Sequence, residues 1–214
     1  MRRMGAAVFL IFTVSLTSPG QDQVDSQTIA KKIEPSVLSV AAYDKGGKVL
    51  QRSTGFFASE LGDVITRRRA FPPGTHRAEV RTVDGKTYQV IAVATEYKEI
   101  DIVRLWVQLS SDKVKPVEAA ATAPRPGERV VVLSMPEPER KRVTEGVIAV
   151  IEDLERGRFI QVNANLPEGS TGSPVVNGKG EVIGVALYLR SDHATFIANG
   201  AEKIRGWAND LSPG

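Results

Sequence analysis

The sequence contains no cysteine and only two histidines, His76 and His193, among its 214 residues. The absence of cysteine excludes disulfides, thiolate nucleophiles, cysteine-based zinc sites and a lipoprotein anchor. Two histidines are too few for a three-histidine metal site, and histidine-dependent catalysis has only these two candidates. We therefore expect neither a metal nor a cofactor.

The chain also lacks a strong excess of charge. Lys and Arg number 28 and Asp and Glu number 25, which gives a formal net charge of +3. Arg2 and Arg3 lie in a segment that we expect to be removed, so the mature chain is closer still to neutrality. This balance predicts neither a nucleic acid nor an anionic membrane as partner. A composition that is 42% hydrophobic and 25% charged is typical of a globular protein.

No hydrophobic run is long enough to span a bilayer, which needs about 20 residues. Residues 1–20 combine two arginines, the apolar run Gly5–Leu16 and the small-residue exit 17–20. This order is typical of a secretory signal peptide, with cleavage expected after Gly20. We therefore expect a periplasmic or extracellular protein without stable membrane insertion after signal removal. An uncleaved membrane anchor is the alternative.

Beyond residue 33 the sequence alternates short β-like runs with turn residues. The expected strands are Val37–Tyr43, Gly55–Ser59, Asp63–Thr66, Ala78–Val83, Thr87–Ala94, Asp101–Leu109, Pro116–Ala119, Arg129–Ser134, Glu145–Ile151, Phe159–Ala164, Ser173–Val176, Glu181–Leu189 and Thr195–Ala198. Their spacing favours a β-sandwich or barrel. Helices are expected only near the ends, at Gln27–Ile33 and Asn199–Leu211.

An alanine- and proline-rich segment at 118–128 divides these strands into two groups of about six. We expect a signal peptide at 1–20 and an N-terminal barrel at about 33–117. The linker then occupies 118–128, and a C-terminal barrel with its terminal helix occupies 129–211. Two small barrels packed together fit this division.

Four separated stretches carry a resemblance to a known family. They are Ser53–Phe57 with Gly62–Thr66, Asp84–Tyr88 with Glu99–Val103, Pro126–Val130, and Gly169–Asn177 with Glu181–Gly184. In this order and spacing they resemble a trypsin-like serine peptidase of the HtrA/Deg type. The resemblance implies an all-β fold of two six-stranded antiparallel barrels packed together, with a short N-terminal helix and a C-terminal helix.

The resemblance also assigns the catalytic positions, and two of the three are altered. The histidine position is Arg69, whose guanidinium cannot act as a base near neutral pH. The serine position is Thr171, a β-branched hydroxyl that still needs a base. The acid remains as Asp101, which we expect to pair with Arg69, both partly buried. A lone buried charge would be costly.

The remaining family positions are backbone or pocket groups. The resemblance implies an oxyanion hole from the N–H groups of Gly169 and Thr171, and substrate-binding positions at Ser170, Ser173 and Gly184. Without a base, we expect an inactive peptidase homologue that binds a peptide or protein segment as a regulatory module.

Two alternatives stay open. The first is an active but atypical serine/threonine-type endopeptidase that uses His76 or His193 as its base. The second is a purely structural envelope protein whose former catalytic site has no role. The sequence leaves the oligomeric state open.

Overall fold

The computed structural model describes residues 25–109, 113–155, 157–189 and 194–198. In chain order the elements are α1 (Ser26–Ile33), η1 (Glu34–Ser36), β1 (Val37–Tyr43), β2 (Val49–Phe57), β3 (Asp63–Arg67), η2 (Arg68–Ala70), β4 (Arg77–Arg81), β5 (Thr87–Tyr97), η3 (Lys98–Ile100), β6 (Ile102–Val107), β7 (Arg129–Ser134), β8 (Arg142–Leu154), β9 (Gly157–Asn163), β10 (Pro174–Val176), β11 (Val182–Leu189) and β12 (Ala194–Ala198).

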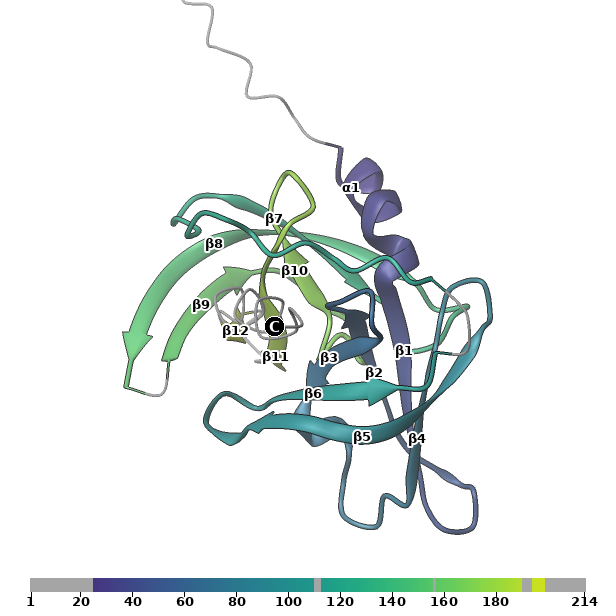
Figure 1. The fold of residues 1–214 in the computed structure, drawn as a ribbon. Helices are drawn as coiled ribbons and strands as arrows, with labels where there is room; N and C mark the ends of the chain where they lie inside the picture. The colour runs from purple at the N-terminus through teal and green to yellow at the C-terminus, as the bar shows by residue number, and fades with distance from the viewer. Residues whose placement is uncertain (1–24, 110–112, 156, 190–193, 199–214) are drawn as a thin grey trace, which may run out of the picture.

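The strands form two closed antiparallel barrels that share one topology (Figure 1). The first has the order β1-β2-β3-β6-β5-β4, and the second repeats it as β7-β8-β9-β12-β11-β10. Closure pairs β1 with β4 and β7 with β10, so each barrel is six-stranded. The predicted fold class is therefore confirmed.

Alternation along the strands builds three hydrophobic cores. On β6, Val103, Leu105 and Val107 point into the first barrel, where one core is buried. A second core fills the other barrel. Ile102 faces the opposite side of β6 and joins a third core, which gathers side chains from both barrels and from α1. This third core holds the barrels against each other and fixes the seam at which the candidate site lies.

Helix α1 is short and covers the second barrel. Asp25 caps its N-terminus, because its carboxylate accepts the Gln27 N–H at 3.1 Å and the Thr28 hydroxyl at 2.9 Å. The same hydrogen bonds, that of Gln27 first, lower the pKa of Asp25. The apolar face of α1 buries Ile29 and Ile33 in the core between the barrels. Among the described residues, no helix is long and apolar enough to cross a membrane.

Several strands differ from the predicted ones; β5 continues to Tyr97 and β6 ends at Val107, for example. Pro116–Ala119 is a connector with one bridge, Ala119 to Val182, instead of a strand. Its amides and carbonyls are divided between the barrels: the Val117 N–H donates to Phe57 O at 2.9 Å and Glu118 O accepts the Val182 N–H at 2.7 Å. Strand β2 begins earlier than predicted and β8 is longer at both ends. The predicted helix at Asn199–Leu211 lies outside the described residues.

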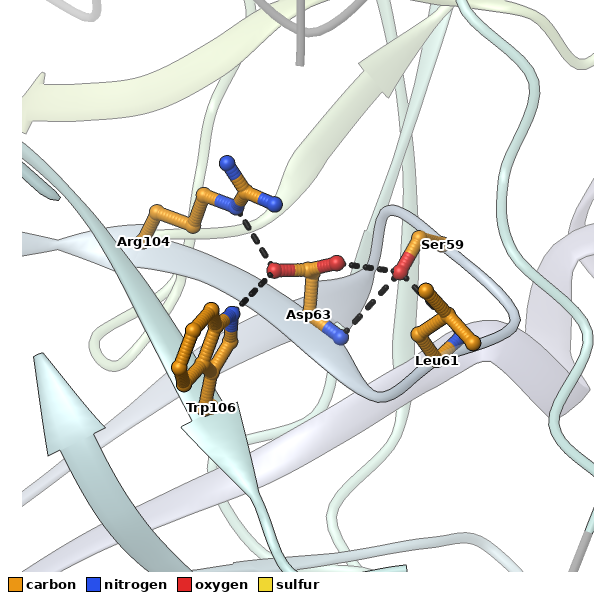
Figure 2. Close-up of polar contacts among 5 residues, drawn as sticks. All are labelled: Ser59, Leu61, Asp63, Arg104 and Trp106. Carbon is orange, nitrogen blue, oxygen red and sulfur yellow. Dashed lines mark hydrogen bonds and ion pairs between the residues drawn. The ribbon is translucent and has the colours of Figure 1, made fainter. Parts of the chain in front are cut away.

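A buried ion pair joins β3 to β6 at the end of the pair away from Asp101 (Figure 2). Asp63 is 2% exposed and Arg104 is 7% exposed. The Asp63 Oδ1 accepts the Arg104 Nε–H at 2.6 Å and the Trp106 Nε1–H at 2.9 Å. The Ser59 hydroxyl donates to Oδ2. This network fixes one end of β3, whose other end leads into the candidate site.

Candidate functional site

The candidate site lies at the seam where a loop of the second barrel rests on β2 of the first. Thr54 makes three hydrogen bonds across the seam. Its N–H donates to Thr171 O at 3.2 Å. Its hydroxyl donates to Gly169 O at 3.0 Å and accepts the Met135 N–H at 2.9 Å. The loop 169–173 is therefore held by one residue of the opposite barrel.

At Gly172 the main chain of the second barrel packs directly on the first barrel. The φ of Gly172 is +89°, and an added Cβ would lie 2.1 Å from Thr54 O, 2.4 Å from Thr66 Oγ1 and 3.2 Å from Arg67 N. Only glycine fits such a position, for both its conformation and its space. The contact places Thr171 beside the end of β3, from which the chain runs directly into Arg69.

Asp101 reaches the same place from η3. It is the only non-glycine residue with positive φ, at 54°, in the described part of the chain. Aspartate tolerates this left-handed conformation better than most residues. Its main-chain oxygen accepts the Arg68 N–H at 2.8 Å, and its Oδ1 accepts the Arg69 N–H at 3.2 Å. Asp101 thus holds the main chain of η2 in position.

The expected pairing of Asp101 with Arg69 exists only as a loose contact. Arg69 Nε lies 3.8 Å from Asp101 Oδ1, whereas Arg67 Nη2 lies 3.1 Å from Oδ2. The side chains of Asp101 and Arg67 are 19% and 20% exposed, but that of Arg69 is 70% exposed. The expectation that both partners are partly buried is therefore wrong for Arg69.

Arg67 is the partner that the sequence reasoning missed. It pairs with Ile102 in the antiparallel register of β3 and β6, and Ile102 directly follows Asp101. An antiparallel alignment of the two apolar strands in the sequence could have placed Arg67 beside Asp101.

We expect Asp101→Ala to lower the free energy of unfolding by about 2 kcal/mol. The change removes the acceptor of the Arg69 N–H, leaves Arg67 without its counter-ion and puts alanine in a left-handed conformation. Asp101→Asn keeps an oxygen acceptor and tolerates that conformation, so it should cost about half as much. Urea unfolding followed by circular dichroism measures both; an alanine variant as stable as wild type would contradict this account.

The hydroxyls near the expected nucleophile have different surroundings. Thr171 is partly buried, and its hydroxyl makes no hydrogen bond with another described residue. Ser170 and Ser173 are fully buried. The Ser134 hydroxyl donates to Ser170 Oγ at 2.8 Å and accepts from the Ser173 hydroxyl at 3.3 Å. The hydroxyls of Ser170 and Ser173 are thus engaged inside the protein.

The described histidine, His76, is not placed as a base for Thr171. His76 is exposed, and its main-chain N–H donates to Tyr43 O at 2.8 Å. Tyr43 is four residues along β1 from Ser39, which pairs with Thr54. Four strand residues span about 13 Å, so His76 lies well away from the seam. His193 lies outside the described residues.

The predicted oxyanion hole consists of two main-chain N–H groups. No described residue accepts a hydrogen bond from the N–H of Gly169 or of Thr171, so both remain available as donors. Gly184 is buried in β11, where it pairs with Val175. Within the described ranges, no group of three histidine, cysteine, aspartate or glutamate side chains could hold a metal ion.

A comparison of the sequence with known families agrees with the double-barrel fold. The family model for the trypsin-like peptidase domain matches residues 53–185, more than half of the chain. This chain belongs to the trypsin-like peptidase family. The matched range contains Arg69, Asp101 and Thr171, the three residues that the motif resemblance assigned to the catalytic positions.

Similar proteins include peptidases and a regulator. The chain is 29% identical over 177 residues to the serine protease HTRA3 of Homo sapiens, with 73% of this chain and 38% of that protein covered. It is 23% identical over 204 residues to the putative serine protease HhoA of Synechocystis, with 86% and 51% covered. It is 27% identical over 178 residues to the anti-sigma-I factor RsgI9 of Acetivibrio thermocellus, with 83% and 25% covered. The chain thus spans about half or less of the length of these relatives.

Proposed function

We propose that this trypsin-like domain does not hydrolyse peptide bonds and instead binds an extended polypeptide segment at the barrel seam. The observation that carries the proposal is the residue at the position of the base. The main-chain N–H of Arg69 donates to Asp101, but the Arg69 guanidinium carries only donors and has no acceptor for a proton. It cannot remove a proton from the Thr171 hydroxyl, so the hydroxyl stays a weak nucleophile.

Polypeptide binding needs none of the missing chemistry. The free N–H groups of Gly169 and Thr171 can donate to carbonyl oxygens of a bound chain. Main-chain recognition of an extended segment gives affinity without a triad. The similarity to an anti-sigma factor is consistent with a trypsin-like domain in a regulatory protein.

Export is part of the same proposal. It is supported by the two arginines and the apolar run within residues 1–20, a segment outside the described residues. In this setting the domain binds exposed polypeptide segments in the periplasm or outside the cell.

We expect the purified mature chain to release no fluorescent peptides from labelled casein above a protein-free blank, with Thr171→Ala indistinguishable from wild type. Loss of the base or of the nucleophile of a triad costs about a million-fold in rate. Turnover by wild type that vanishes in Thr171→Ala would contradict the proposal and support the atypical endopeptidase. Equal turnover in both would identify a contaminant or another nucleophile. Arg69→His combined with Thr171→Ser tests whether these two positions alone silence the site.

A further inference from the structure

The end of β3 carries more positive charge than its surroundings neutralise. Arg67, Arg68 and Arg69 are consecutive, and Asp101 is the one acidic side chain within ion-pair distance of them among the described residues. Arg68 forms no ion pair there. Three guanidinium groups and one carboxylate leave an excess of two positive charges.

The shared carboxylate does not saturate its partners. Oδ2 of Asp101 is taken by Arg67, and Oδ1 by the main-chain N–H of Arg69. The Arg69 guanidinium lies 3.8 Å away, beyond hydrogen-bond distance, and is 70% exposed. The Nε atoms of Arg67 and Arg68 are buried without a hydrogen-bond partner. Donors on the three arginines are therefore left without acceptors.

Main-chain donors lie beside these arginines. Gly172 packs on Arg67, since its added Cβ would lie 3.2 Å from the Arg67 nitrogen. The unpaired N–H groups of Gly169 and Thr171 belong to the same short loop. Amide and guanidinium donors carried by two segments in contact favour a small planar anion, and a carboxylate matches the fork of a guanidinium.

We propose that this site binds a carboxylate of the polypeptide segment, with the Arg69 guanidinium as its main partner. The inference rests on the proposed function and specifies the ligand: a segment with an Asp or Glu side chain, or with a free C-terminus, at the seam. At the position of the missing base, the Arg69 side chain would thus bind the ligand instead of accepting a proton. Nucleic acid is disfavoured, because the whole chain carries a net charge of only +3.

The test is a titration with sodium acetate followed by NMR of the arginine Nε–H groups and the Thr171 amide, against sodium chloride at equal ionic strength. We expect saturable acetate-specific shifts at Arg69 and Thr171. Arg69→Gln should weaken acetate binding about tenfold, and Arg69→Lys, which keeps the charge without the fork, by less. The matched control is Arg125→Gln, at an exposed arginine outside the seam, and it should change nothing.

Equal shifts with chloride, or undiminished acetate binding in a folded Arg69→Gln variant, would overturn the inference. Tighter binding of inorganic phosphate than of acetate would overturn the assignment to a carboxylate. The source is separated with a short fluorescent peptide bearing a glutamate and a free C-terminus, and with its glutamine and C-terminal amide versions. Casein turnover would contradict the proposed function without touching the titration, so the two failures are distinguishable.

Discussion

Gly172→Ala is expected to destabilise the protein by about 4 kcal/mol or more, one of the largest effects of any single methyl group in this chain. The new Cβ would lie 2.1 Å from Thr54 O, which belongs to β2 and cannot withdraw without breaking the seam. Thr66 Oγ1, at 2.4 Å, is fixed as well because it donates to the same oxygen at 2.7 Å. Urea unfolding followed by circular dichroism measures the loss.

Gly74→Ala is the matched control for this substitution. Gly74 has nearly the same φ, +90°, but no atom lies within 4 Å of its added Cβ. It should lose only about 1–2 kcal/mol for the left-handed conformation. The difference between the two variants isolates the steric contact across the seam. If both variants lose the same stability, the close approach of Gly172 to Thr54 is refuted.

Asp63→Ala should cost about 4 kcal/mol, because it removes the carboxylate that accepts a hydrogen bond from the buried Arg104 guanidinium. The substitution also removes the acceptor of the Trp106 indole N–H and of the Ser59 hydroxyl. For a domain stable by roughly 5–15 kcal/mol, this is a large fraction of the total. The same urea experiment gives the number, and Trp106 fluorescence reports on the local change.

An exposed ion pair supplies the control for Asp63→Ala. Glu137 lies 3.3 Å from Arg52, with side chains 32% and 40% exposed. Glu137→Ala should therefore cost less than about 1 kcal/mol. Asp63→Leu combined with Arg104→Met should recover only part of the loss, since a packed apolar pair needs no counter-ion but leaves the Trp106 N–H and the Ser59 hydroxyl without their acceptor. If Asp63→Ala costs no more than Glu137→Ala, the buried pair has no special role.

Much of the fold follows from local patterns in the sequence. The bounds of β1 and β7 were predicted to the residue, because both are apolar runs that end at turns or polar residues. The predicted strand at β2 began too late, because the polar and exposed Gln51 and Arg52 interrupt the apolar pattern of β2. Pro116–Ala119 has a strand-like composition, but its main-chain groups serve both barrels and not one ladder. Such divided pairing depends on tertiary structure and leaves no local signal.

The candidate site was predictable in outline and not in detail. Motif order predicted that the side chains of Asp101 and Arg69 pair, whereas the structure brings Asp101 Oδ1 to the main-chain N–H of Arg69. The preference of Asp101 for Arg67 depends on the β3–β6 register, which motif matching does not provide. The network around Asp63 was missed, because its members are separated by 41 and 43 positions in the chain.

The hydrogen bonds of Thr54 bear on how such a protein changes over generations. The seam is held by main-chain groups and by the hydroxyls of Thr54 and Thr66, none of which belongs to the side chains that would perform hydrolysis. Substitutions at positions 69 and 171 therefore escape selection for folding, whereas those at 54 and 172 do not. A lineage can exchange peptidase chemistry for recognition and keep its architecture throughout.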